Sequence, residues 1–76
     1  MTVANQHVAL EVRAHLARRR LKRADLAAVL GVSLRTVSDL LGERRAWRLD
    51  ELEAVARWLG LELADLLPAK ARGRAR

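Results

Sequence analysis

Residues 23–41 decide the fold, and they read RADLAAVLGVSLRTVSDLL. Apolar residues at helical spacing in this stretch predict two short helices, over about residues 23–30 and 33–42. The residues expected on their inner faces are Leu26, Ala27 and Leu30 in the first and Val37, Leu40 and Leu41 in the second. Gly31 lies between the helices, where a residue without a Cβ suits a tight left-handed turn. Ser33 follows as a candidate N-cap for the second helix.

The outer face of the second helix carries the candidate functional residues, which are Leu34, Arg35, Thr36, Ser38 and Asp39. A helix fits the major groove of DNA, where polar side chains can contact base edges. Arg35 is expected to donate to guanine O6 and N7, against a role as a phosphate ligand or a solvated side chain. Leu34 either touches a thymine methyl or packs at the helix edge. Asp39 either accepts from cytosine N4 or, as we prefer, orients Arg35 one turn back.

Composition agrees with a small all-α DNA-binding domain. Ala and Leu supply most of the 51% hydrophobic residues in a chain of 76, which favours a helical bundle. The net charge of +6 indicates a polyanionic partner. The absence of Cys excludes disulfides and thiolate metal sites, and no apolar run approaches the roughly 20 residues of a membrane span. We therefore expect a cytoplasmic, nucleoid-associated protein without cofactor, metal or small-molecule ligand.

The rest of the chain supplies three further helices. Val8, Val12 and Leu16 predict a first helix over about residues 5–19, and a fourth helix is expected over about 49–59. Leucines in 61–67 predict a short fifth helix ended by Pro68. Residues 5–68 thus form one domain, and residues 69–76 form a basic tail that we expect to be disordered. Residues 1–48 are net basic and residues 49–69 net acidic, so the last two helices should face away from DNA.

The chain resembles the lambda-repressor/Cro-like helix-turn-helix domains, the XRE family, over about residues 8–67. The resemblance is carried by Leu26-Ala27, Gly31-Val32-Ser33, Val37, Ala56, Leu59-Gly60-Leu61 and Leu66. It implies a five-helix bundle that binds pseudo-palindromic operators as a dimer and reads bases with its third helix. The phosphate-binding candidates that follow from it are Arg23, Ser33, Arg44, Arg45 and Arg48.

Two positions depart from the family pattern. Leu16 and Leu41 stand where similar proteins often bury an ion pair, so we expect them in mutual apolar contact. Lys22 stands where a Ser or Thr cap is common, and Asp25 in the first turn should compensate in part.

The function predicted is a sequence-specific regulator of transcription, a small repressor of phage or mobile-element type similar to Cro. The alternative is the antitoxin of a toxin–antitoxin pair, and a third possibility is a helical adaptor that never binds DNA. Trp58, Leu63 and Leu66 are the candidate dimer contacts, whereas Trp47 is expected to brace the loop that precedes the fourth helix. His7 and His15 lack the companions of a metal site, and no catalytic constellation is present, so we expect no enzyme.

Overall fold

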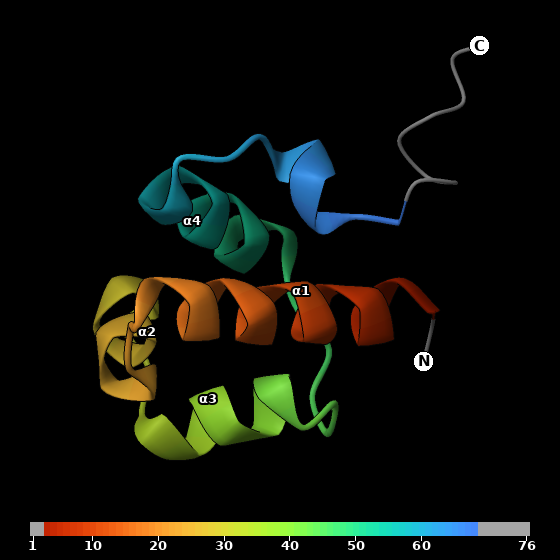
Figure 1. The fold of residues 1–76 in the computed structure, drawn as a ribbon. Coiled ribbons are helices and arrows are strands. Elements are labelled where there is room, and N and C mark those ends of the chain that lie inside the picture. The colour runs from red at the N-terminus through yellow and green to blue at the C-terminus, as the bar shows by residue number, and fades with distance from the viewer. Residues whose placement is uncertain (1–2, 69–76) are drawn as a thin grey trace, which may run out of the picture.

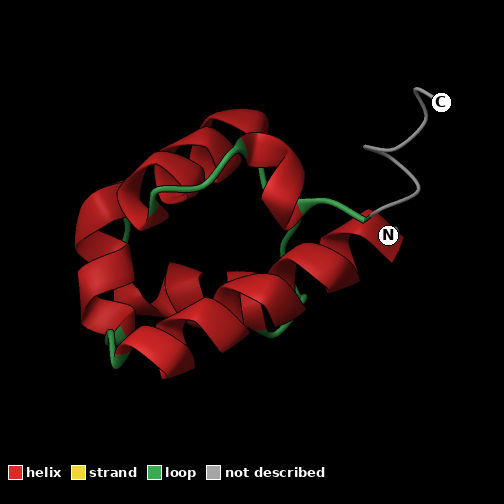
Figure 2. Ribbon diagram, turned by 45° about the horizontal axis from the view of Figure 1, so that its top comes forward, coloured by secondary structure: helices red, strands yellow, loops and turns green. Residues whose placement is uncertain are grey.

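The computed structural model describes residues 3–68, which form four α-helices and one turn of 3₁₀ helix. In chain order these are α1 (Val3–Arg19), α2 (Arg23–Leu30), α3 (Leu34–Leu41), α4 (Leu49–Leu59) and η1 (Leu63–Leu66). Only loops join them, and the described residues contain no strand (Figure 2). The all-α prediction is confirmed. The predicted disorder of residues 69–76 lies outside the described residues.

The longest helix, α1, runs through the middle of the molecule (Figure 1). It contacts α3 on one side and η1 on the other, while α2 packs against both α3 and α4. The core comprises chiefly Val8, Val12, Leu16, Leu26, Val37, Leu40, Leu41, Trp47, Val55, Leu59 and Leu66. Leu16 and Leu41 are both in this core, as apolar replacements for an ion pair require. Since α4 and η1 lie across α1 from α3, the outer face of α3 stays open.

The turn between α2 and α3 forms as the sequence predicts. Gly31 has φ 70°, the left-handed conformation that glycine adopts without strain, and the Val32 N–H donates to the Ala27 carbonyl at 3.0 Å. Ser33 Oγ then accepts the backbone N–H of Thr36 at 3.1 Å. These two local devices stop one helix and start the next, so the chain forms a helix-turn-helix.

Two helices begin without an N-cap side chain that can accept a hydrogen bond, because lysine and arginine are donors only. Each helix uses a carboxylate three residues later instead. Asp25 Oδ2 accepts the backbone N–H of Lys22 at 2.8 Å, and Glu51 Oε1 accepts that of Arg48 at 2.9 Å. This arrangement is half of a capping box. The predicted compensation by Asp25 is therefore confirmed.

The fifth element corrects the sequence-based expectation of a fifth α-helix. It is a single 3₁₀ turn of four residues, Leu63–Leu66. Gly60, with φ 73°, ends α4, and Leu67 is already extended at φ −101° and ψ 158°. The residue before a proline avoids the helical region because the Pro68 ring would clash with it. Too few residues thus remain for an α-helix, although the turn still buries Leu66 in the core.

Candidate nucleic-acid interface

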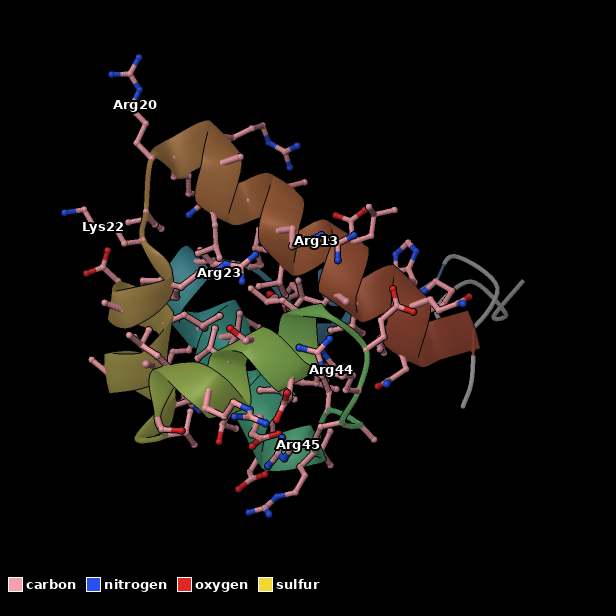
Figure 3. The ribbon with its side chains drawn as sticks, turned by 90° about the horizontal axis from the view of Figure 1, so that it is seen from below. Arg13, Arg20, Lys22, Arg23, Arg44 and Arg45 are labelled. Carbon is pink, nitrogen blue, oxygen red and sulfur yellow. The ribbon has the colours of Figure 1, made fainter. Side chains whose placement is uncertain are left out.

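The outer face of α3 presents the residues that the sequence singled out. Leu34 is 56% exposed and the Arg35 side chain 83% exposed, whereas Thr36, Ser38 and Asp39 are half-buried. Figure 3 looks onto this side of the molecule, and labelled basic side chains from α1, α2 and the loop after α3 surround the helix. An exposed helix of eight residues, flanked by cations, is accessible to a groove of DNA.

The start of α3 is rigid because Ser33 and Thr36 bond to each other. Besides its bond to the Thr36 N–H, Ser33 Oγ lies 3.2 Å from Thr36 Oγ1. The hydroxyl therefore has a structural role at this helix start. Its contact with a phosphate stays a prediction.

The predicted phosphate-binding arginines differ in how free their guanidinium groups are. Arg23, Arg44 and Arg48 are exposed. Arg45 is only half-exposed, and its Nη1 and Nη2 atoms lie 3.1 and 2.8 Å from the two carboxylate oxygens of Glu51. A bidentate pair of this kind holds the guanidinium in one geometry. Arg45 thus fixes the loop between α3 and α4 to α4, and Nε is the donor group least committed to that pair.

Glu51 is the residue of this region that sequence reasoning missed, since it was counted only as part of the net acidic segment 49–69, which was expected to face away from DNA. It is 6% exposed and is the acceptor for both Arg45 and the Arg48 N–H. Burial alone raises the pKa of its carboxyl group, but the hydrogen bonds from Arg45 and Arg48 outweigh burial and hold that pKa below its ordinary value. Its position three residues after a helix N-cap was the available signal.

Asp39 lies between two arginines. The predicted pair with Arg35 is present, with Arg35 Nε 3.7 Å from Asp39 Oδ2. On the other oxygen, Arg44 Nε donates to Asp39 Oδ1 at 3.2 Å, a contact that spacing along one helix could not reveal. The carboxylate therefore connects the outer face of α3 to the loop that follows it.

Two further arginines stabilise the fold, and their partners could not be predicted from the spacing of residues along the chain. Arg13 Nη1 donates to the carbonyl of Leu41 at 2.6 Å, and Arg19 Nη1 donates to that of Leu59 at 2.7 Å. These carbonyls stand in the last turns of α3 and α4, where unpaired acceptors carry partial negative charge. Part of the positive charge of α1 is thus used inside the molecule.

The opposite side holds the candidate dimer contacts, and one of them must be corrected. Leu66 is fully buried in the core of the single chain, so it has no surface to offer a second copy. Trp58 and Leu63 are partly exposed and pack against that core. Leu63 also lines an open groove of about 390 Å³, together with Glu53, Ala56, Arg57, Leu61 and Glu62.

Trp47 braces the loop, as predicted. Its side chain is buried, and its backbone N–H donates to Asn5 Oδ1 at 3.1 Å. The loop is therefore attached to the first turns of α1.

Neither a metal centre nor a membrane span is found within residues 3–68. The described His, Asp and Glu residues form no group of three that could hold a metal ion, although Glu11 lies 3.9 Å from both His7 and His15. None of the described helices is long and apolar enough to cross a membrane.

The tight turn at Gly31, the capped helix after it and that helix's exposed polar face define a helix-turn-helix domain that binds double-stranded DNA. Comparison with protein families gives the same class and narrows it. Residues 11–71 match the family model of the Cro/C1-type HTH DNA-binding domain, and the chain belongs to that family. Domains of this family are typically regulators of transcription and not enzymes. Comparisons with curated proteins and with solved structures gave no significant match.

Proposed function

We propose that this protein is a sequence-specific repressor of phage or mobile-element type, which reads the major groove with the outer face of α3. The observation that carries the proposal is the exposed Arg35 on a helix whose start is fixed by the Ser33 cap. A guanidinium on a rigid helix can donate two hydrogen bonds to guanine.

We assign the contacts with DNA according to where each side chain lies and how accessible it is. Base-edge contacts are assigned to the outer side of α3, that is Leu34, Arg35, Thr36 and Ser38, while Asp39 lies beside Arg35 on the same side. Phosphate contacts are assigned to Arg23, Ser33, Arg44 and Arg48, while Arg45 acts mainly through the loop that it holds. Phosphate contacts set the register of the protein on the duplex, and base contacts specify the sequence.

We also propose a homodimer on a pseudo-palindromic operator, joined through the surface around Trp58 and Leu63. This surface lies on the side of the molecule away from α3 and borders the acidic residues Glu53 and Glu62, which would repel phosphate. A dimer formed there leaves both α3 helices free for DNA.

Selection of bound sequences from a random duplex pool tests the function. We expect the protein to enrich paired half-sites that contain guanine. Arg35→Ala should lose that enrichment, whereas Arg18→Ala, which removes the same charge from an exposed position on α1, should keep it. A pool that stays random after selection with the unchanged protein overturns the proposal, and a reporter gene behind the selected site then distinguishes repression from activation.

A further inference from the structure

The carboxylate of Asp39 is shared by one arginine of α3 and one arginine of the following loop. Oδ2 lies 3.7 Å from Arg35 Nε, and Oδ1 lies 3.2 Å from Arg44 Nε. Both guanidinium groups are mostly exposed, while the Asp39 side chain is 27% exposed and sits between them. Each pair engages Nε, so the terminal Nη atoms of both arginines remain available for DNA.

The backbone fixes this arrangement independently of the side chains. The carbonyl of Asp39 accepts the N–H of Arg44 at 2.8 Å and that of Arg45 at 3.2 Å, which folds the loop back onto the end of α3. Gly42 leaves room for it, because a Cβ there would lie 3.0 Å from the Ser38 carbonyl and 3.2 Å from Arg44 Nη1. Arg44 is thus positioned by the main chain beside Asp39.

Two cations around one carboxylate set the electrostatics of this surface. An acidic side chain next to phosphates costs affinity for every DNA sequence, because the duplex is uniformly negative. Asp39 therefore needs a compensating role at the interface. An arginine that is held at Nε presents its two terminal nitrogens in a defined direction, as bidentate contact with guanine requires.

We propose that Asp39 is a specificity-determining positioning residue, which holds Arg35 for guanine and ties it to the phosphate-contacting Arg44 instead of contacting a base itself. The inference rests on the proposed function. Because Arg44 pairs through Nε, its terminal nitrogens can contact a phosphate while the same carboxylate still holds Arg35. Asp39 thus lowers the affinity for every duplex and increases the preference for guanine over other bases.

The test compares Asp39→Asn with Glu43→Gln in the full chain. Glu43 is exposed, lies in the same loop and forms no ion pair within residues 3–68, so its variant removes an equal charge without releasing either arginine. Binding is measured to a random-sequence duplex and to the duplex selected by the unchanged protein. A third duplex has the selected sequence with one change. The guanine that Arg35→Ala no longer prefers is replaced by another base.

We expect both variants to bind the random duplex several-fold more tightly than the unchanged protein. Only Asp39→Asn should lose guanine discrimination, by about tenfold, which is within the range of one bidentate contact. Asp39→Glu, which keeps the charge but moves the carboxylate, should lose discrimination without gaining affinity for the random duplex. This variant keeps the inference testable if the asparagine variant folds poorly.

Three results would overturn the inference. Equal guanine discrimination in Asp39→Asn and the unchanged protein removes the positioning role. Loss of a cytosine preference with guanine preference intact makes Asp39 a base acceptor instead. Failure of the unchanged protein to prefer any sequence overturns the proposed function, and this inference with it.

Discussion

Some arginines of this protein stabilise the fold, and others are exposed and available to a partner. Their hydrogen-bond partners distinguish the two groups. Arg13 and Arg19 donate to helix carbonyls, and Arg45 is paired with Glu51. Arg23 and Arg44 are exposed beside α3 (Figure 3). Net charge alone therefore overstates the number of cations that are available to DNA.

Replacement of the buried carboxylate should weaken the fold in a pH-dependent way. Glu51→Gln leaves Arg45 with a weaker acceptor, and we expect the free energy of unfolding at pH 7 to fall by about 1–3 kcal/mol. Because the pKa of Glu51 in the folded protein is below its ordinary 4.5, its contribution is present above about pH 4.5 and is lost as pH falls through the folded pKa. Denaturation by urea from pH 7 down to about pH 3 measures both effects.

The control for this experiment is Glu53→Gln, which removes an exposed carboxylate from the same helix. Its free energy of unfolding should equal that of the unchanged protein throughout the acidic range. The free energy of unfolding of Glu51→Gln should be lower at pH 7 and reach the value of the other two proteins at low pH. Identical pH profiles for all three proteins would contradict the role assigned to Glu51.

Arg44 and Arg45 are neighbours in sequence with opposite expected phenotypes. Arg44→Ala should lower affinity for every duplex and reduce the salt dependence by about one contact, with little change in stability. Arg45→Ala should instead lower the melting temperature, because it strands the Glu51 carboxylate. Binding titrations at several salt concentrations and thermal melts of both variants decide the matter. The reverse pattern would show that the loop arginines have been assigned the wrong roles.

At the scale of the elements, local chemistry sets where the described helices begin and end. The predicted bounds of the helices at 23–30 and 49–59 agree with α2 and α4, because glycine ends and first-turn carboxylates can be read from neighbouring residues. The expected fifth helix over 61–67 was wrong, since Pro68 was taken only to end that helix, whereas Leu67 before it is already extended and a single 3₁₀ turn remains. Contacts between Arg45 and Glu51, or between Arg13 and Leu41, depend on how the loop and helices pack. No periodicity encodes such contacts.

The candidate site likewise combines features that the sequence predicts with contacts that depend on how the chain packs. The outward direction of Arg35 followed from helical spacing, as did its pair with Asp39, because both residues lie on one helix. The approach of Arg44 to Asp39 depends on the path of the backbone through Gly42 and Glu43, where Glu43 has φ 63°. The burial of Leu66 depends on the packing of η1 against α1 and α4.

The turn of the helix-turn-helix offers a backbone test at the same scale. Gly31→Ala should cost about 1–2 kcal/mol, because alanine in the left-handed region brings its Cβ close to the following carbonyl. Apart from Gly31 itself and its two chain neighbours, a Cβ at this position has no heavy atom within 4 Å, so the loss reflects the backbone conformation and not a clash with the rest of the molecule. Gly31→Asn should lose less, since asparagine tolerates this conformation better. Equal losses in urea denaturation of the two variants would point to packing instead.

At the scale of the whole molecule, α3 and α4 lie on different sides of α1 (Figure 1). The exposed cations near α3 are thus separated from the groove beside α4, which Glu53 and Glu62 help to line. This separation orients the domain toward DNA before any base is read. If each copy of a dimer places three arginines on phosphates, about six contacts predict a log–log salt slope of about −5 for the affinity. Titrations of a duplex over a range of salt concentrations measure it, and a slope near zero would contradict a phosphate interface.

The proposed dimer is favoured by the short length of α3. An α3 of eight residues is only about 12 Å long and reaches a few base pairs, too few to mark one site in a genome. Two copies with their α3 helices about 34–36 Å apart would read successive major grooves. We therefore expect sedimentation velocity to show two copies on a selected palindromic duplex. Leu63→Glu should reduce this to one copy, because it places a charge on the proposed contact surface.

Leu49→Glu is the matched control, since Leu49 is a 61% exposed leucine at the start of α4, whereas Leu63 lies in η1. It should leave two copies on the duplex. If Leu63→Glu also retains two copies while its melting temperature stays unchanged, the copies meet through another surface. A one-to-one complex that recruits no second copy at excess unchanged protein would exclude the dimer itself, whichever surface joins it.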